Sequence, residues 1–403
     1  MLLLIAWRNI WRNKLRSSIV IISITLGIWA GIFVMGLSVG LTNQRMENTI
    51  SSYISHIQIH NPAFSQNQDI NDTLINRAAI QEKLNTSTVL KAWSERSIIN
   101  AMVASAAGNY GVRINGIDPD KEQTVSSIHR LIKKGSYFET KGRNPIVIGE
   151  KLAARLKVKE RSKVVLTFLN TDGDIIAGSF RVAGIYKTAS STFDERQLYI
   201  KQDDLFRLLG RPVVHEIAML HNNMDAVADY TSTLTTAFPE NDSEAWNDLA
   251  PELGYASEML GTMLYLYIGI VLMAMGFGII NTMLMAVLER KRELGMLLSV
   301  GMNKQKVFVM IMLETCFLAV IGGPAGILFA YQSIQYFHEK GIDLSQFAKG
   351  LESLDIGAIV YTDLDNFYYW NIGVLVMLTA LVASIYPSIK ALKLKPAEAV
   401  RAI

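Results

Sequence analysis

The sequence predicts an α-helical membrane protein with four transmembrane helices and a large α+β extracytoplasmic domain inserted between the first and second helices. Half of the 403 residues are hydrophobic and the mean hydropathy is +0.24. This excess lies in four stretches that are almost free of charge, at residues 19–41, 259–288, 307–337 and 367–389. A hydrocarbon core about 30 Å thick needs about 20 helical residues, and lipid leaves no partner for unpaired backbone groups. The alternative, four buried helices of a soluble protein, requires unusually long uncharged helices.

Lysine and arginine gather in three short segments, residues 1–18, 289–306 and 390–403, whereas the loop 338–366 is mainly acidic. Basic residues beside spans stay on the cytoplasmic side, and long domains cross the membrane regardless of charge. Both termini and the link 289–306 are therefore expected in the cytoplasm, and the domain 42–258 outside. The basic residues concerned are Arg8, Arg12, Lys14, Arg16, Arg290, Lys291, Arg292, Lys304, Lys306, Lys390, Lys393, Lys395 and Arg401.

The single cysteine, Cys316, falls in the third predicted span. This excludes an intramolecular disulfide and a cysteine-based metal site. The outer domain must therefore be stabilised by its hydrophobic core, for which it is large enough. The first apolar stretch is longer than the core of a signal peptide, so we interpret it as a permanent anchor.

The N-terminal segment 1–18 is predicted to form an amphipathic interfacial helix. Apolar residues recur every three or four positions beside a stripe of arginines, so that indoles can lie at headgroup level and guanidinium groups near phosphates. The helix could act as a lever on the inner leaflet, as a topology anchor, or as both. The apolar residues are Leu4, Trp7, Trp11 and Leu15, and the basic stripe is Arg8, Arg12 and Arg16.

The domain 42–258 shows a mixed α and β pattern. A helix over 42–52 would continue the first span, 64–73 reads as a loop, and hairpins are expected at Gly108-Asn109 and over 171–174. The second span is long enough for residues 259–265 to rise from the membrane as a stalk, although tilt could absorb part of the excess. Strands are expected at 56–60, 97–107, 110–117, 145–149, 163–170, 175–185, 197–200 and 213–220, and helices at 150–156, 203–209 and 224–237.

Motifs of metalloproteases, serine hydrolases and phosphate-binding loops are missing from the sequence. His56 and His60 share one face of a predicted strand, but a third metal ligand is not visible nearby, so no resident cofactor or metal is predicted. Glu314 is the one charged residue inside a span, which makes it a functional candidate. Coupling or packing is one role for it and proton transport another, and it lies about two helical turns from the cytoplasmic link, where a carboxylate can reach lipid headgroups or Lys304 and Lys306.

Glycines four residues apart predict close helix packing in two spans. The spacing does not distinguish contacts within the chain from contacts between two chains, and chance is a further alternative. Pro324, beside the third pair, should bend its helix. The glycines are Gly27, Gly31, Gly36, Gly40, Gly322 and Gly326.

The central link 289–306 contains a short helix with an apolar edge and charged flanks. Such a helix could rest on lipid, or it could present its apolar edge to a groove on a cytosolic partner. Gly295 and Gly301 permit close approach and a helix end. The apolar edge is Leu294, Leu297 and Leu298, and the charged residues are Glu289, Arg290, Arg292 and Glu293.

The pattern Glu-Arg-x-Arg-Glu-Leu-Gly-x-Leu-x-x-x-Gly at 289–301 resembles the hallmark of the FtsX-like permeases, a family that includes MacB-type exporters and the lipoprotein-releasing LolC and LolE subunits. Segments 6–14, 148–153 and 387–401 resemble the amphipathic start, a piece of the outer domain and the C-terminal signature of that family. Segment 159–163 departs from it, because Glu-Arg-Ser stands where relatives often have a Gly-Asp turn. The resemblance covers essentially the whole chain and is not specific to one member.

The resemblance implies a permease subunit in the bacterial inner membrane. It implies a pair of permease chains, identical or paralogous, and a separate ATPase dimer that binds ATP and Mg and docks on the central links. The spans would pass motion to the outer domains, which act on cargo with or without a periplasmic carrier or adaptor; nucleic acid has no part. Within the family we expect lipoprotein release first, then MacB-like export of peptides, toxins or antibiotics, and then FtsX-like signalling. A membrane-tethered enzyme ranks last because the catalytic motifs are missing.

Overall fold

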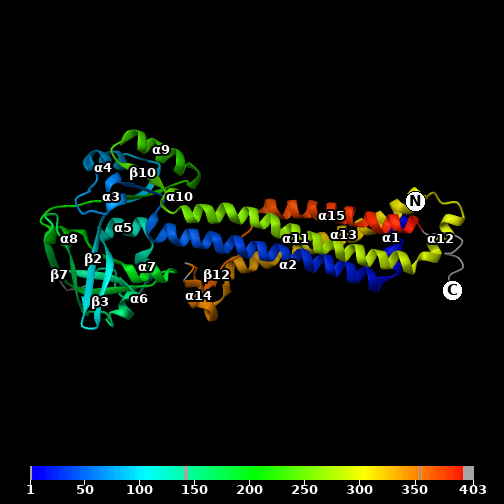
Figure 1. Ribbon diagram of the computed structural model, residues 1–403, viewed down its shortest axis with the longest axis horizontal. Coiled ribbons are helices and arrows are strands. Elements are labelled where there is room, and N and C mark those ends of the chain that lie inside the picture. The colour runs from blue at the N-terminus through cyan, green and yellow to red at the C-terminus, as the bar shows by residue number, and fades with distance from the viewer. Residues whose placement is uncertain (1, 140–143, 353, 355, 394–403) are drawn as a thin grey trace. The chain divides into compact units, whose positions relative to one another are not determined.

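The structure is a computed structural model that describes residues 2–139, 144–352, 354 and 356–393. It divides into two compact units (Figure 1). The helical unit comprises Met1–Thr42, Ser257–Ile342 and Val360–Ile403, and the outer domain comprises Asn43–Ala256 and Asp343–Ile359. Lys395 and Arg401 of the predicted basic tail lie outside the described residues.

Four long helices run alongside one another in the helical unit (Figure 1). Each is long and apolar enough to cross a membrane, which confirms the four predicted spans. Their buried side chains form one continuous apolar core. The long helices are α2 (Lys14–Thr49), α11 (Pro251–Glu289), α13 (Lys304–Lys340, which continues through Pro324) and α15 (Asn366–Leu392); the short ones are α1 (Leu2–Arg12) and α12 (Lys291–Ser299).

The second span is much longer than a bilayer core. With 39 residues, α11 is about 58 Å long at 1.5 Å per residue. A tilt of about 40°, the upper end of the usual range, lets a 30 Å core accommodate only about 39 Å of helix. Tilt alone therefore does not account for α11, which supports the predicted stalk.

The predicted N-terminal helix is shorter than expected. α1 ends at Arg12, and Leu15 belongs to α2 instead. Ser17 donates a hydrogen bond to the backbone oxygen of Ile10 at 2.7 Å, which fixes the corner between the helices. Trp7 remains partly exposed and packs edge-on against Phe317 of α13.

The outer domain is built on a ten-stranded sheet. Six strands pair in the cycle β2–β3–β8–β5–β7–β6–β2, so they close into a ring with an apolar interior. The other four strands extend the sheet at its ends. The strands are β1 (Ile57–His60), β2 (Leu90–Ser105), β3 (Gly108–Ile117), β4 (Ile132–Gly135), β5 (Pro145–Gly149), β6 (Lys163–Leu169), β7 (Ile175–Tyr186), β8 (Gln197–Lys201), β9 (Glu216–His221) and β10 (Asp242–Ala245).

A second apolar core lies beside the ring, where β1 and β9 pack against two helices, α4 and α9. A buried ion cluster adjoins it: Arg96 of β2 lies 2.7 Å from Glu122 and 2.8 Å from Glu216. The helices of the domain are α3 (Pro62–Asn67), α4 (Arg77–Asn85), α5 (Pro119–Val125), α6 (Glu150–Arg155), α7 (Ser191–Arg196), α8 (Gln202–Leu209), α9 (Val227–Ala237), α10 (Trp246–Leu249) and α14 (Ala348–Glu352); a π-helical turn at Ile50–Ile54 follows α2.

Three local predictions for the outer domain were wrong. The pairing of Ser105 with Gly108 puts the hairpin turn at 106–107, because the Ser105 hydroxyl accepts a hydrogen bond from the backbone N–H of Ala107. Strand β9 begins at Glu216 rather than at residue 213. The expected loop 64–73 starts inside α3, whose N-terminus is capped by the Asn61 side chain.

Part of the loop between the third and fourth spans belongs to the outer domain. Its Glu352 carboxylate lies 2.9 Å from the Lys187 ammonium and 3.0 Å from that of Lys151. The sequence predicted only a short connecting loop here. These ion pairs instead attach Glu352 of this loop to α6, which carries Lys151, and to the segment directly after β7, which carries Lys187.

Candidate functional site

The predicted coupling segment forms a separate short helix in the structure. α11 ends at Glu289, Arg290 makes the corner, and α12 follows. After α12, Gly301 adopts a left-handed conformation (φ +96°) that residues with a side chain rarely adopt, and Met302 donates its backbone N–H to Leu297. Gly301 therefore ends the helix, as the sequence predicted.

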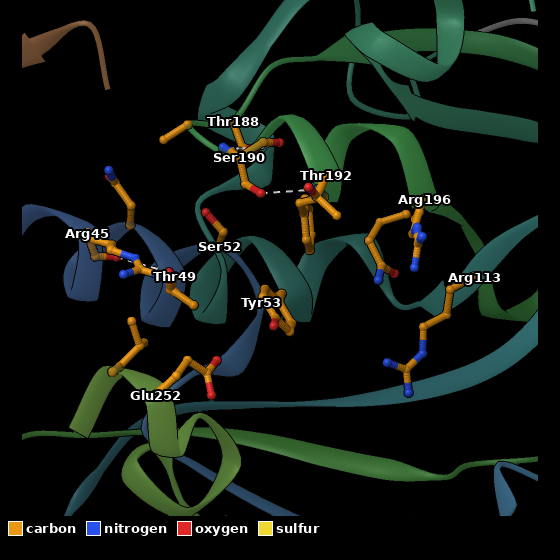
Figure 2. Close-up of a pocket in the computed structure, with 15 residues that line it drawn as sticks. Arg45, Thr49, Ser52, Tyr53, Arg113, Thr188, Ser190, Thr192, Arg196 and Glu252 are labelled. Atoms are coloured by element: carbon orange, nitrogen blue, oxygen red, sulfur yellow. Dashed lines mark hydrogen bonds between the residues drawn. The ribbon is translucent and has the colours of Figure 1, made fainter. Parts of the chain in front are cut away.

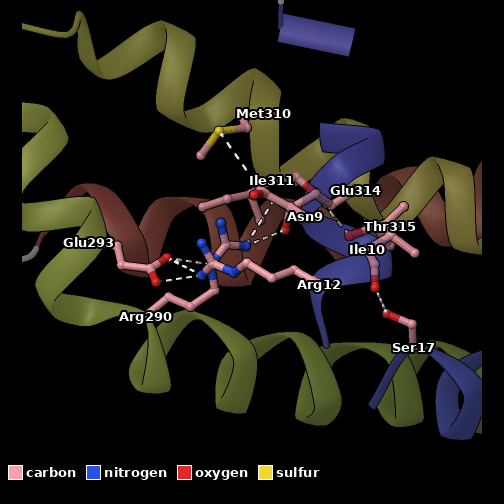
Figure 3. Close-up of polar contacts among 10 residues, drawn as sticks. All are labelled: Asn9, Ile10, Arg12, Ser17, Arg290, Glu293, Met310, Ile311, Glu314 and Thr315. Atoms are coloured by element: carbon pink, nitrogen blue, oxygen red, sulfur yellow. Dashed lines mark hydrogen bonds and ion pairs between the residues drawn. The ribbon is translucent and has the colours of Figure 1, made fainter. Parts of the chain in front are cut away.

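Glu314 of α13 is only 6% exposed and is neutralised within the chain. Nη1 of Arg290 lies 3.0 Å from each of its carboxylate oxygens, and the Asn9 amide donates a hydrogen bond to Oε1 at 2.6 Å (Figure 3). The carboxylate thus pairs with Arg290 and Asn9 rather than with Lys304 or Lys306, as had been expected. Lys306 lies about 12 Å away along the same helix, beyond comfortable side-chain reach.

Two further ion pairs join α12 and the end of α11 to the N-terminal helices. Glu293 pairs with Arg12 and lies 3.2 Å from Nε of Arg290, while Glu289 pairs with Arg16. The hydrogen bond from Arg12 lowers the pKa of Glu293 below its ordinary value, and Arg290 adds to this effect. Arg12 and Arg16 were expected beside lipid phosphates. Instead, two arginines four residues apart meet two glutamates four residues apart.

We call Asn9, Arg12, Arg290, Glu293 and Glu314 the charge ring. It joins α1, the corner before α12, α12 itself and α13, around a cavity of about 290 Å³. Removing one member of a buried ion pair leaves an uncompensated charge, which is strongly unfavourable. These helix ends are therefore held together as one polar assembly inside an otherwise apolar unit.

The apolar edge of α12 faces the chain's own core. Leu294 is 2% exposed, Gly295 is buried, and Leu297 and Leu298 are partly buried against the same core. The expectation that Leu294 projects toward a partner was therefore wrong. Helical periodicity places a different set outward: Arg292, Met296 (57% exposed) and Val300 (84% exposed).

Five of the six predicted packing glycines contact other parts of the same chain. A Cβ at Gly326 would lie 2.8 Å from the Thr25 backbone oxygen, and one at Gly322 would lie 3.0 Å from Ile24. Gly31 faces Val271 at 3.2 Å. Gly36 faces Ile334, and Gly40 faces the backbone at 361–363. Gly27 is the exception, since a Cβ there would meet nothing within 4 Å.

The two histidines of the first predicted strand, His56 and His60, contact different groups in the structure. His60 lies 3.2 Å from Glu244, while His56 precedes β1 and accepts a hydrogen bond from the His221 backbone. Within the described ranges, groups of three potential metal ligands are not found.

Comparison with known proteins identifies both halves of the chain. Residues 17–237 match the MacB-like periplasmic core domain, and residues 265–396 match the FtsX-like permease C-terminal domain. The chain belongs to the MacB- and FtsX-like permease family. The resemblance of segment 289–301 to these permeases is thereby confirmed.

Curated relatives of this permease are distant. It is 21% identical over 300 residues to LolC, a lipoprotein-releasing system transmembrane protein of Xylella fastidiosa, which covers 72% of each chain. It is 23% identical over 420 residues to YknZ of Bacillus subtilis, an uncharacterized ABC transporter permease, covering 98% of this chain and 97% of YknZ. It is 24% identical over 346 residues to PvdT of Pseudomonas syringae pv. tomato, a pyoverdine export ATP-binding/permease protein, and spans about half of that relative's length.

Among solved structures, the periplasmic region of MacB from Actinobacillus actinomycetemcomitans matches 52% of the permease and 97% of its own chain, at 12% identity and a TM-score of 0.36. The family and the four apolar helices together identify an ABC transporter permease of the inner membrane.

The sequence did not reveal the role of Asn9, although a signal was present. Asn9 belongs to the repeated Trp-Arg-Asn motif at residues 7–9 and 11–13. An amide on the face of α1 that carries buried Ala6 and Ile10 is expected to meet a polar group in the adjacent helix. Glu314 is that group.

Proposed function

We propose that this permease receives the movement of a separate ABC ATPase at α12 and uses it on the extracytoplasmic side, to release lipoproteins from the inner membrane. The charge ring is the observation that carries the coupling part of this proposal. It bonds the corner and first turn of α12 to both α1 and α13. A push on α12 therefore displaces membrane helices as well as the link.

The proposed docking surface is the outward face of α12. Arg292 and Met296 of α12 lie on it together with Val300, which follows the helix directly, and none of the three belongs to the apolar core of the helical unit. Apolar anchors at the centre of an interface typically contribute about 2 kcal/mol or more, whereas exposed charges contribute less. Met296 and Val300 would be the anchors, and Arg292 would steer the approach.

Lipoprotein release is supported by the match to the lipoprotein-releasing protein LolC, which covers 72% of each chain. YknZ matches over more of its length, but it is described as uncharacterized and so points to no cargo. The relatives PvdT and MacB are named as combined ATP-binding and permease proteins, and the chain spans only about half of each. The phosphate-loop motif that is typical of ATP-binding regions is missing from this sequence. Export of a small molecule is the second candidate, because the identities to exporters are equally high.

The test is reconstitution of the permease with its co-purifying ATPase in proteoliposomes that contain a labelled triacylated lipoprotein. We expect ATP to transfer the lipoprotein to the soluble fraction when a lipoprotein-binding carrier is added. ATP hydrolysis without any transfer would reject lipoprotein release and leave the export candidate.

Coupling is tested separately with two variants of α12. Met296→Ala with Val300→Ala should release the ATPase during purification while the permease keeps its thermal stability. Leu294→Ala should lower stability, because it removes a buried side chain. Val309→Ala, which alters an exposed apolar residue of α13, is the control. Retention of the ATPase at wild-type yield by the Met296 and Val300 double variant would reject this docking surface.

A further inference from the structure

The outer domain contains a polar pocket that is unrelated to the charge ring. Its volume is about 320 Å³, within the range of pockets for small ligands. The end of α2, the π-helical turn, β3, the segment after β7, α7 and the first turn of α11 contribute its walls (Figure 2). The side chains that matter for its chemistry are Arg45, Thr49, Ser52, Arg113, Thr188, Ser190, Thr192, Arg196 and Glu252.

Three arginines line this pocket without a carboxylate partner. Among the described residues, Arg45, Arg113 and Arg196 form no ion pair. The Nε atoms of Arg45 and Arg113 are buried and lack a hydrogen-bond acceptor in the described chain. Buried donors are nearly always satisfied, so both guanidinium groups retain unused hydrogen-bonding capacity beside the pocket.

The arginines approach the pocket from two sides. Figure 2 shows Arg113 and Arg196 on one side and Arg45 on the other. Glu252 is the one carboxylate in the lining, and it is not paired with any of the three. Three positive charges against one negative charge favour an anionic ligand.

Hydroxyl groups cover the wall between the arginines, and part of this wall is held in place. Thr188 donates a hydrogen bond to the buried Asp194 at 2.8 Å, and its hydroxyl accepts one from the Ser190 backbone at 3.0 Å. The Ser190 hydroxyl in turn accepts a hydrogen bond from the Phe193 backbone at 3.2 Å. The segment that carries Thr188 and Ser190 is therefore ordered before any ligand arrives.

We propose that this pocket binds a phosphoryl anion, as a phosphate monoester or diester. Guanidinium groups present parallel N–H donors that match two phosphate oxygens. The Thr188 and Thr49 hydroxyls already donate to Asp194 and to the Arg45 backbone, so the further donors to the anion are the hydroxyls of Ser52, Ser190 and Thr192. Arg113 and Arg196 hold the anion from one side, and Arg45 adds its positive charge from the other. The phosphoryl group can come from a lipid headgroup or from a soluble phosphate compound, since the chemistry of recognition is the same.

The experiment uses the full-length protein in a phosphate-free detergent and follows its thermal unfolding. One arm adds inorganic phosphate. The other arm compares nanodiscs of phosphatidylglycerol with nanodiscs of a glycolipid that lacks phosphate. Variants are Arg113→Gln with Arg196→Gln, and Arg196→Gln alone, which changes an exposed side chain and leaves the fold intact. Arg161→Gln, an exposed arginine outside the pocket, is the control.

We expect stabilisation of the wild type and the control in at least one arm, with affinity about tenfold or more weaker in the Arg196 variant. Stabilisation by inorganic phosphate identifies a soluble ligand, and stabilisation by phosphatidylglycerol alone identifies a lipid headgroup. Equal responses of wild type and Arg196→Gln in both arms, or no response of the wild type in either, would overturn the proposal.

Discussion

Nη1 of Arg290 lies 3.0 Å from both carboxylate oxygens of Glu314, so a single guanidinium neutralises the charge that α13 carries within its apolar length. The two residues are 24 positions apart and belong to different helical segments. Their ion pair turns an unfavourable intramembrane carboxylate into a bond between the link and a span.

Breaking this pair should destabilise the helical unit. Glu314→Ala leaves Arg290 largely buried with only the partly exposed Glu293 as a counter-charge, and we expect a loss of about 2 kcal/mol in the free energy of unfolding. Thermal unfolding in detergent measures it. Adding Arg290→Met should restore much of the loss, because both charges are then gone. Lys304→Ala, which removes an exposed charge, serves as the control, and equal behaviour of the control and Glu314→Ala would contradict the role of the pair.

The glycines of the spans should differ in what they tolerate. Gly326→Leu places a side chain against Thr25 and Ile28 of α2, so the folded yield and melting temperature should fall sharply. Gly27→Leu meets open space and should leave the isolated chain stable. Chemical cross-linking of the Gly27→Leu variant then reports on pairing: a selective loss of dimers locates an interchain contact at Gly27, and unchanged dimers place the interface elsewhere.

The attachment of residues 343–359 to the outer domain should depend on pH. Hydrogen bonds from Lys187, with help from Lys151, lower the pKa of Glu352 to about 2. Because this value is below the ordinary 4.5, the pair stabilises the folded state above about pH 4.5, and this contribution is lost as the pH falls toward 2. Glu352→Gln should therefore cost about 1 kcal/mol at pH 7 and almost nothing near pH 2.

Differential scanning fluorimetry of the wild type and Glu352→Gln between pH 7 and pH 3 measures this difference. Glu160→Gln is the matched control, since Glu160 forms a longer, exposed pair with Arg161. A difference between wild type and Glu352→Gln that stays constant over the whole pH range would contradict the assignment.

The proposed orientation can be tested by cysteine labelling in a Cys316→Ser background. Cysteines at Asn109 and Gln346 should react with an impermeant reagent added outside intact spheroplasts, whereas a cysteine at Gln305 should react only after lysis. Gln305 is used instead of Asn303 because the Asn303 side chain caps α13. Labelling of Gln305 in intact cells would reverse the proposed cytoplasmic location of the link and of both termini.

The spans were predictable because lipid forces an apolar composition on every membrane helix, so the signal is local. Strands such as β6 and β7 were predictable for a similar reason, since their alternating residues and the turn between them lie within one short segment. The contacts that define the candidate site are not local. Arg12 meets Glu293, and Arg290 meets Glu314, only after the chain has folded.

The sequence was most misleading about what the apolar face of α12 packs against. The pattern Leu294, Leu297 and Leu298 correctly predicts one apolar face, but it does not say what covers that face. A core within the chain and a groove on a partner require the same composition. Only the packing of α12 distinguished them.

The ends of the ten-stranded sheet bear on how neighbouring outer domains can meet. Among the described strands, β10 and β4 stand at the two ends of the strand order, and each pairs with a single neighbour, β1 and β7 respectively, so each leaves one backbone edge open. Both strands are four residues long; β10 carries Asp242 and Glu244, and β4 carries Lys133 and Lys134. Short, charged edges resist the addition of a foreign strand. Where many copies of the protein lie close together on one membrane, their outer domains are thus protected from pairing through strand edges into a shared sheet. Contacts between neighbouring outer domains must then be made by side chains.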